Sequence, residues 1–199
     1  MATDGRNERG VRTRRALLDA SMAIIAESGV AAATQRSVAV MAATSLASTT
    51  YHFGTRSGLL EATLEHAAQV AIIEIEALRE DILSGRVDLV DACVAYINRQ
   101  RMGQSVTAAV VFELALTAAR MPALRSANES FVTALRSLFA PFTPSAEGIA
   151  VAESFYGVLL LELARGDSGA SPELERTIIT IFDAYGITEV VNRLRGGNA

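Results

Sequence analysis

The side chains best suited to chemistry lie between residues 45 and 52, where hydroxyl and aromatic groups follow one another closely. The segment offers Ser45, Leu46, Ala47, Ser48, Thr49, Thr50, Tyr51 and His52. Small hydroxyl groups approach base edges closely, and they can either donate or accept a hydrogen bond there. Tyr51 and His52, at the end of the segment, are placed to reach a phosphate. The chemistry indicated is therefore noncovalent recognition of a nucleic acid.

Arginine residues surround this segment on both sides. Arg56 stands at the start of an expected helix, where free backbone N–H groups and the helix dipole also attract phosphate. Arg36 lies in the preceding helix, near the expected path of a duplex backbone. A cluster at the N-terminus consists of Arg6, Arg9, Arg12, Arg14 and Arg15. Such an arm adds salt-dependent affinity for DNA or reaches into a minor groove.

Two short helices separated by a tight turn are expected to position these groups. Thr34 is a suitable N-cap for a helix to about Ala43, and Ser45 is a suitable N-cap for a second helix to about Phe53. This spacing predicts a helix-turn-helix, whose second helix usually enters the major groove of DNA.

Less specific explanations exist for each of these groups. The hydroxyls could cap helices and face solvent, Tyr51 could pack partly in the core, and the arginines could form a solvated tail. A metal site at His52 is disfavoured because the other histidine, His66, falls on a different helix. The order and spacing of the groups together favour DNA binding.

The remainder of the chain reads as a series of apolar helices. Strand signals are nearly absent, and half of the 199 residues are hydrophobic, which predicts an all-α protein of about nine helices with a substantial core. The expected helices span about 11–28, 34–43, 45–53, 55–83, 87–102, 104–119, 122–140, 146–165 and 172–185, with a short helical tail to Leu194. The expected organisation is a flexible basic arm (1–10), a DNA-binding domain (11–56) and a helical body (57–199).

Charge and composition narrow the function classes. Residues 1–56 carry a net charge of +3, whereas residues 57–199 carry −7, so we expect only the first part to meet a polyanion. The single cysteine, Cys93, allows no intrachain disulfide and fits a reducing compartment. No signal peptide or membrane span is expected, which indicates a soluble, cytoplasmic protein. Two separated histidines, one cysteine and no nucleophile motif argue against an enzyme, a metal site or a cofactor.

Residues 12–60 resemble the DNA-binding head of the tetracycline-repressor (TetR) family of bacterial transcription regulators. The resemblance rests on residues 14–20, Glu27-Ser28-Gly29, Thr34 with Val38-Ala39, Ala42 and Ser45, Tyr51-His52-Phe53, Thr55-Arg56 and Leu59-Leu60. The family usually has Gly where this chain has Ala43, Val where it has Thr44, Tyr where it has Thr50 and Lys where it has Arg56. The resemblance implies that Arg14, Thr34, Arg36, Arg56 and residues 45–52 form the DNA-binding surface.

In this family the body binds a small molecule and dimerises, so the resemblance implies both properties here. The expected pocket wall consists of Tyr96, Met102, Phe112, Glu113, Met121, Phe131 and Phe155. Glu113 stands out as an acid within an apolar helix, where it could orient a ligand or pair with an arginine such as Arg99 or Arg120. The expected dimer interface consists of Phe155, Leu159, Leu163, Ile178, Ile181 and Phe182. The helix over 146–165 independently carries more apolar surface than one side can bury.

The resulting hypothesis is a homodimeric repressor that leaves a palindromic operator when it binds an apolar or amphipathic effector. Two alternatives remain: a helical small-molecule-binding protein without DNA binding, and an activator that needs no effector. The altered turn at Ala43 and Thr44 is the feature that favours the first alternative.

Overall fold

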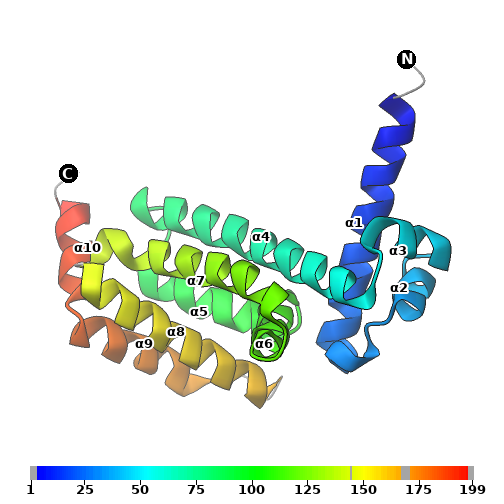
Figure 1. Cartoon of the computed structure of the whole chain (residues 1–199). Helices are drawn as coiled ribbons and strands as arrows, with labels where there is room; N and C mark the ends of the chain where they lie inside the picture. Colours follow the sequence, from blue (N-terminus) through cyan, green and yellow to red (C-terminus); the bar gives the residue numbers. More distant parts are fainter. Residues whose placement is uncertain (1–3, 144, 167–170, 197–199) are drawn as a thin grey trace. The chain divides into compact units, whose positions relative to one another are not determined.

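Ten α-helices and three short 3₁₀ helices form the described part of the chain, which comprises residues 4–143, 145–166 and 171–196 of a computed structural model. No strand occurs in these ranges, so the all-α prediction is confirmed (Figure 1). The α-helices are α1 (Asp4–Ser28), α2 (Gln35–Met41), α3 (Leu46–Phe53), α4 (Arg56–Leu83), α5 (Leu89–Arg101), α6 (Thr107–Ala118), α7 (Arg125–Phe139), α8 (Ser145–Arg165), α9 (Pro172–Ala184) and α10 (Ile187–Gly196).

The chain divides into two compact units. The N-terminal unit contains residues 1–70 and 106–129, and the C-terminal unit contains residues 71–105 and 130–199. Helix α4 contributes its first half to one unit and its second half to the other. The sequence placed the boundary between head and body after residue 56, whereas α6 packs with the N-terminal helices.

The N-terminal unit is built on α1, which packs against α2, α3 and α6. Its buried apolar side chains include Leu17, Ile25, Val38, Leu59 and Leu64. Burial of such side chains is the main stabilising contribution to a core of this kind. Two polar contacts link α1 to α4: a buried hydrogen bond from Thr63 to Ser21, and a 2.9 Å contact between His66 Nε2 and Asp19 Oδ1.

Helix α1 begins earlier than the sequence predicts. It starts at Asp4 instead of residue 11, so residues 4–10 continue the first helix, while residues 1–3 lie outside the described ranges. The physical reason is that Arg and Glu favour helix, and Gly5 and Gly10 each cost only about 1 kcal/mol. Gly29, with φ at 76°, follows the last residue of α1 as predicted.

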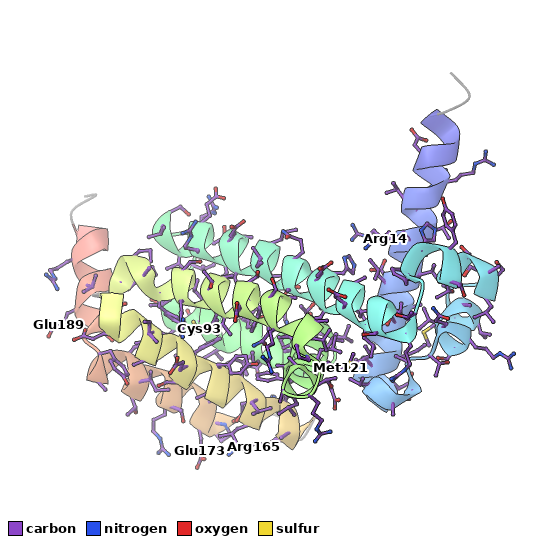
Figure 2. All side chains as sticks on the ribbon, viewed as in Figure 1. Arg14, Cys93, Met121, Arg165, Glu173 and Glu189 are labelled. Carbon is purple, nitrogen blue, oxygen red and sulfur yellow. The ribbon has the colours of Figure 1, made fainter. Side chains whose placement is uncertain are left out.

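The C-terminal unit is a bundle in which α5 packs against α8 and α9, and α10 packs against α9. Figure 1 shows α8 and α9 running side by side. An aromatic chain forms the centre: the ring of Phe139 lies 5.6 Å from that of Phe155 and 5.9 Å from that of Phe182. Cys93 is buried on α5, and burial raises the pKa of its thiol, consistent with a structural side chain (Figure 2).

Two kinds of feature are missing from the described residues. None of their helices is long and apolar enough to cross a membrane. Nor do three or more of their His, Cys, Asp and Glu side chains gather as metal ligands would.

Candidate nucleic-acid interface and effector-binding body

Helix α2 begins at a reciprocal cap built from two hydroxyl residues. The N–H of Ser37 donates to Thr34 Oγ1 over 3.0 Å, and the N–H of Thr34 donates to Ser37 Oγ over 2.9 Å. Each bond satisfies a backbone donor that the first turn of a helix leaves without a partner. Thr34, predicted as a DNA contact and as a cap, therefore has the capping role in this structure.

The turn between α2 and α3 forms although its sequence departs from the family pattern. Ala43 adopts a φ of 50°, in the left-handed region that favours glycine. The N–H of Thr44 donates to the carbonyl of Ala39 over 2.9 Å, and the N–H of Ala43 donates to that of Val40 over 3.1 Å. Ser45 then caps α3 by accepting from the N–H of Ser48. The altered turn residues have not abolished the helix-turn-helix.

The outer face of α3 exposes Leu46, Ala47, Thr50 and Tyr51. These positions recur at helical spacing and form one stripe. Tyr51 has 85% of its surface accessible, against 44% for Leu46. This stripe is the surface that α3 can present to a partner.

Most of the hydroxyls predicted to contact bases are occupied or buried. Thr49 has no exposed surface, so its role as a DNA contact is corrected. The hydroxyl of Thr50 donates to the carbonyl of Leu46 over 3.1 Å, and that of Ser45 serves as the cap. Ser48 is half-buried. The hydroxyls of Ser45 and Thr50 thus bond to the backbone of α3 itself, whereas that of Thr49 is buried without a hydrogen-bond partner.

Arg56 does not extend freely toward a phosphate. Its Nε donates to the carbonyl of Ala33 over 3.0 Å, and its Nη2 donates to the carbonyl of Val30 over 2.6 Å. The guanidinium therefore fastens α4 to the segment before α2, a two-point contact that the fork of an arginine suits. Two N–H groups of Arg56 thus have a structural role, and because the residue is exposed, its predicted phosphate contact stays a prediction.

The other predicted DNA contacts occupy varied positions. Arg36 is exposed on α2, and His52 is half-buried on α3. The guanidinium of Arg14 lies 5.5 Å from the centre of the Phe53 ring, which links α1 to α3 by a cation–π contact (Figure 2). Arg14, Arg36, Tyr51 and Arg56 are thus all exposed among the predicted polar contacts.

Three of the predicted pocket residues are buried in the C-terminal unit. Tyr96 lies beside Phe155, with ring centres 6.4 Å apart, and Phe131 lies 5.9 Å from the ring of Tyr156. Burial raises the pKa of Tyr96, and the nearby carboxylate of Glu74 adds to this effect. These rings make an apolar, aromatic interior of the kind that lines small-molecule sites.

The other four predicted pocket residues have different surroundings. Phe112 is buried in the N-terminal unit and Met121 is half-buried there, while Met102 is exposed at the end of α5. Glu113 is exposed on α6. Its carboxylate therefore does not lie in an apolar interior, and Leu116, one helical turn further along α6, is exposed as well.

Most of the predicted dimer residues are buried by the chain itself. Phe155, Leu159, Ile178 and Phe182 each expose 1% or less of their surface, so a partner cannot contact them. Leu163 and Ile181 are partly exposed. The apolar side chains that α8 and α9 do expose are Ile149, Leu160, Leu161 and Ile179. We call these four residues the exposed apolar face of α8 and α9.

A buried charged group in the C-terminal unit is absent from the sequence predictions. The carboxylate of Glu162 accepts a 2.7 Å hydrogen bond from Arg165, and its Oε2 lies 3.9 Å from Nε of Arg101. The side chains of Arg101 and Glu162 are 4% and 5% exposed. Arg165 and Glu173 lie where the end of α8 meets the start of α9 (Figure 2). Glu162 lies three and seven residues after Leu159 and Phe155, a spacing that could have identified it as buried.

A second polar contact lies nearby on α5. The amide of Gln100 donates to Glu74 Oε2 over 3.4 Å. Partial burial raises the pKa of Glu74, although the charge of Arg99 and this hydrogen bond act in the opposite direction. The C-terminal unit thus contains two carboxylates in partly or fully dehydrated surroundings.

Comparisons with known proteins identify the fold. No protein-family model matches the chain, and neither does any curated protein sequence. Among solved structures, a member of the TetR family from Streptomyces coelicolor A3 is 26% identical, with a TM-score of 0.68, and the match covers 92% of this chain and 97% of that one. This chain has the TetR-family fold. The family is one of transcription regulators and not of enzymes.

Two further neighbours support the assignment. A TetR-family regulator from Mesorhizobium loti, 18% identical with a TM-score of 0.68, covers 89% of this chain and 96% of its own, and it supports the fold alone. The multidrug-binding protein EbrR in complex with imidazole is 26% identical, with a TM-score of 0.65, over 91% of this chain and 93% of EbrR. EbrR has also been solved in complex with ethidium, proflavin and malachite green. The resemblance to the TetR family is therefore confirmed at the level of fold.

Proposed function

We propose that this chain is a TetR-type transcriptional repressor, a homodimer that binds a near-palindromic operator and leaves it when a small molecule binds the body. The observation that carries the proposal is the outer face of α3, because α3 is capped, follows a formed turn and exposes one stripe of side chains. A helix held in this way is suited to enter the major groove. Binding to a chromosomal operator places the protein in the cytoplasm.

The polar contacts to DNA are assigned to Arg36, Tyr51 and His52. Arg36 is exposed on α2, which in a helix-turn-helix crosses the DNA backbone. Tyr51 projects from the end of α3 and reaches a phosphate through its phenol. Phosphate contacts of this kind position a protein on DNA without specifying sequence.

Dimerisation is assigned to the exposed apolar face of α8 and α9. Its four side chains are large, apolar and exposed on neighbouring helices of one unit. Such a face is typical of an interface between subunits. Symmetry then places two α3 helices on successive major grooves, roughly 34–36 Å apart.

The effector is assigned to the aromatic interior of the C-terminal unit. Tyr96, Phe131 and Phe155 supply ring surfaces there, and Glu74 supplies a partly dehydrated carboxylate. EbrR, a multidrug-binding protein with the same fold, has been solved in complex with ethidium and with proflavin, so these are the first compounds to test. Coupling of roughly 1–3 kcal/mol between the effector and operator sites is usual for such switches.

Operator binding is tested by selecting duplexes from a random-sequence pool with purified protein, together with DNA that flanks its own gene. Fluorescence anisotropy across a salt series then measures affinity for the wild type and for Arg36→Ala and Tyr51→Ala. We expect tenfold or greater weakening in each variant. Arg125→Ala is the matched control for loss of positive charge, because Arg125 is an exposed arginine outside the α2–α3 segment.

Other results would favour other functions. Equal, weak binding to every duplex, with ethidium still bound, would favour a small-molecule-binding protein without DNA binding. Tight operator binding that no dye weakens would contradict the proposed release from the operator by these dyes. A deletion strain with a reporter gene separates repression from activation, since loss of a repressor raises expression and loss of an activator lowers it.

A further inference from the structure

The outer face of α3 lacks the side chains that usually read bases in pairs of hydrogen bonds. Residues 46–53 contain no Arg, Lys, Asn, Gln, Asp or Glu. The bidentate contacts that distinguish guanine and adenine come from Arg, Lys, Asn and Gln, and cytosine is read by Glu or Asp. If α3 enters the major groove, it must read sequence with other groups.

Hydrogen bonds within the protein further reduce the polar groups available. Thr49 is buried, and Ser45 caps the helix. The hydroxyl of the exposed Thr50 donates a hydrogen bond to the carbonyl of Leu46. Gln35 of α2, the nearest amide in the sequence, donates to the carbonyl of Gly54. The polar groups that remain on α3 are the half-buried Ser48 hydroxyl, the Tyr51 phenol and the imidazole of His52.

The outer face of α3 does expose apolar groups. Leu46 is 44% exposed at the first position of α3, where the N-terminal residues of a recognition helix meet base edges. Ala47 and Thr50 are exposed beside it and each carries one methyl group. In the major groove the apolar partner for such groups is the C5-methyl of thymine.

We propose that α3 reads its operator chiefly through thymine C5-methyl groups, with Leu46 as the principal contact and Ala47 and Thr50 beside it. This inference rests on the proposed operator binding. It predicts that each half-site contains at least one thymine whose methyl group, and not its hydrogen-bonding edge, carries the discrimination.

Uracil tests this directly, because it differs from thymine only in lacking the methyl group. Each thymine of the selected duplex is replaced in turn by uracil, and affinity is measured by anisotropy. At the contacted thymine we expect about fourfold weaker binding for each methyl removed, equivalent to one buried CH₂ group. The same position changed to 5-methylcytosine, paired with guanine, should lose less affinity than unmethylated cytosine.

A variant assigns the contact to its side chain. We call the loss of affinity on replacing thymine by uracil the uracil penalty. In Leu46→Ala this penalty should nearly disappear at one thymine of each half-site, because the side chain that contacts the methyl group is gone. Leu116→Ala is the matched control: Leu116 is an exposed leucine on α6, and the uracil penalty should persist. Circular dichroism verifies that both variants fold.

The outcomes separate this inference from the function it rests on. If the random pool yields no enriched sequence, operator binding itself fails. If an operator is enriched but uracil at every position binds as tightly as thymine, methyl readout is overturned while operator binding stands. Methyl readout by Leu46 is also overturned if Leu46→Ala leaves every uracil penalty unchanged.

Discussion

The substitution Glu162→Leu should destabilise the C-terminal unit more than any loss of a surface charge. Glu162 lies inside the bundle with 5% of its side chain exposed, and its Oε2 is 3.9 Å from Nε of Arg101, which is 4% exposed. The introduced leucine is apolar, like its buried neighbours Leu159 and Phe155. It cannot, however, compensate the charge of an arginine that remains buried.

The expected cost follows from that remaining charge. Removing one partner of a buried ion pair costs about 3–5 kcal/mol. For a chain of this length, each kcal/mol lowers the melting temperature by about 2–4 °C. The melting temperature should therefore fall by about 6–20 °C. Loss of the contact between Glu162 and Arg165 adds little to this cost, because half of the Arg165 side chain is exposed and its charge can be hydrated.

Urea denaturation monitored by circular dichroism measures the change, with two further variants beside it. The double variant Arg101→Met with Glu162→Leu should recover most of the stability, since replacing both charges by apolar groups is often neutral. Glu153→Ala breaks the exposed contact with Arg136 and should cost less than about 1 kcal/mol. A double variant as unstable as Glu162→Leu would refute the reasoning, as would a cost for Glu162→Leu no larger than that for Glu153→Ala.

Further substitutions and treatments have defined outcomes. Gly58→Ala should destabilise the N-terminal unit by about 1–3 kcal/mol and weaken DNA binding, because an added Cβ would clash with the carbonyl oxygen of Phe53. Gly10→Ala, with open space around its Cβ, should leave thermal stability equal or higher. Cys93 should resist a thiol reagent in the native state and react once urea unfolds the protein, and equal rates would contradict its burial. Burial raises the pKa of Tyr156 to about 12, so unfolding releases its proton between about pH 10 and 12 and stability falls there as pH rises; Tyr156→Phe should reduce that fall in urea titrations.

The head of the molecule was largely predictable because its signals are local. Thr34 and Ser45 are capping residues whose role depends on neighbours three positions away, and both cap as predicted. The fate of the other hydroxyls was not predictable in the same way. Whether Thr49 faces the core or a partner depends on how α3 rotates against α2, and this rotation is set by packing between elements. Arg56 likewise bonds to carbonyls more than twenty residues away in sequence.

The body shows the limit of reasoning from a single helix. Glu113 and Glu162 are both acids within apolar helices, yet Glu113 is exposed and Glu162 is buried. The difference lies in the residues on the same side of each helix. Glu162 follows the buried Leu159 and Phe155, whereas Glu113 lies three residues before the exposed Leu116. Which stripe faces the core becomes evident only when the neighbouring helices are in place.

Four of the predicted dimer residues are buried for a related reason. The family resemblance assigned Phe155 and Phe182 to an interface, but large apolar side chains are also the first to fill the centre of a bundle. The aromatic chain through Phe139 accounts for both of them. The large apolar side chains that α8 and α9 expose are aliphatic, and periodicity alone could not separate them from the core.

The left-handed backbone of Ala43 has a consequence for how this protein can evolve. An L-residue with a side chain is disfavoured there by about 1 kcal/mol, a cost that glycine avoids. Alanine and glycine codons differ by one nucleotide, so a single mutation at this position can give a more stable turn. Stability gained in this way would allow the lineage to tolerate a destabilising change elsewhere, such as a new side chain on α3 that alters which operator is recognised.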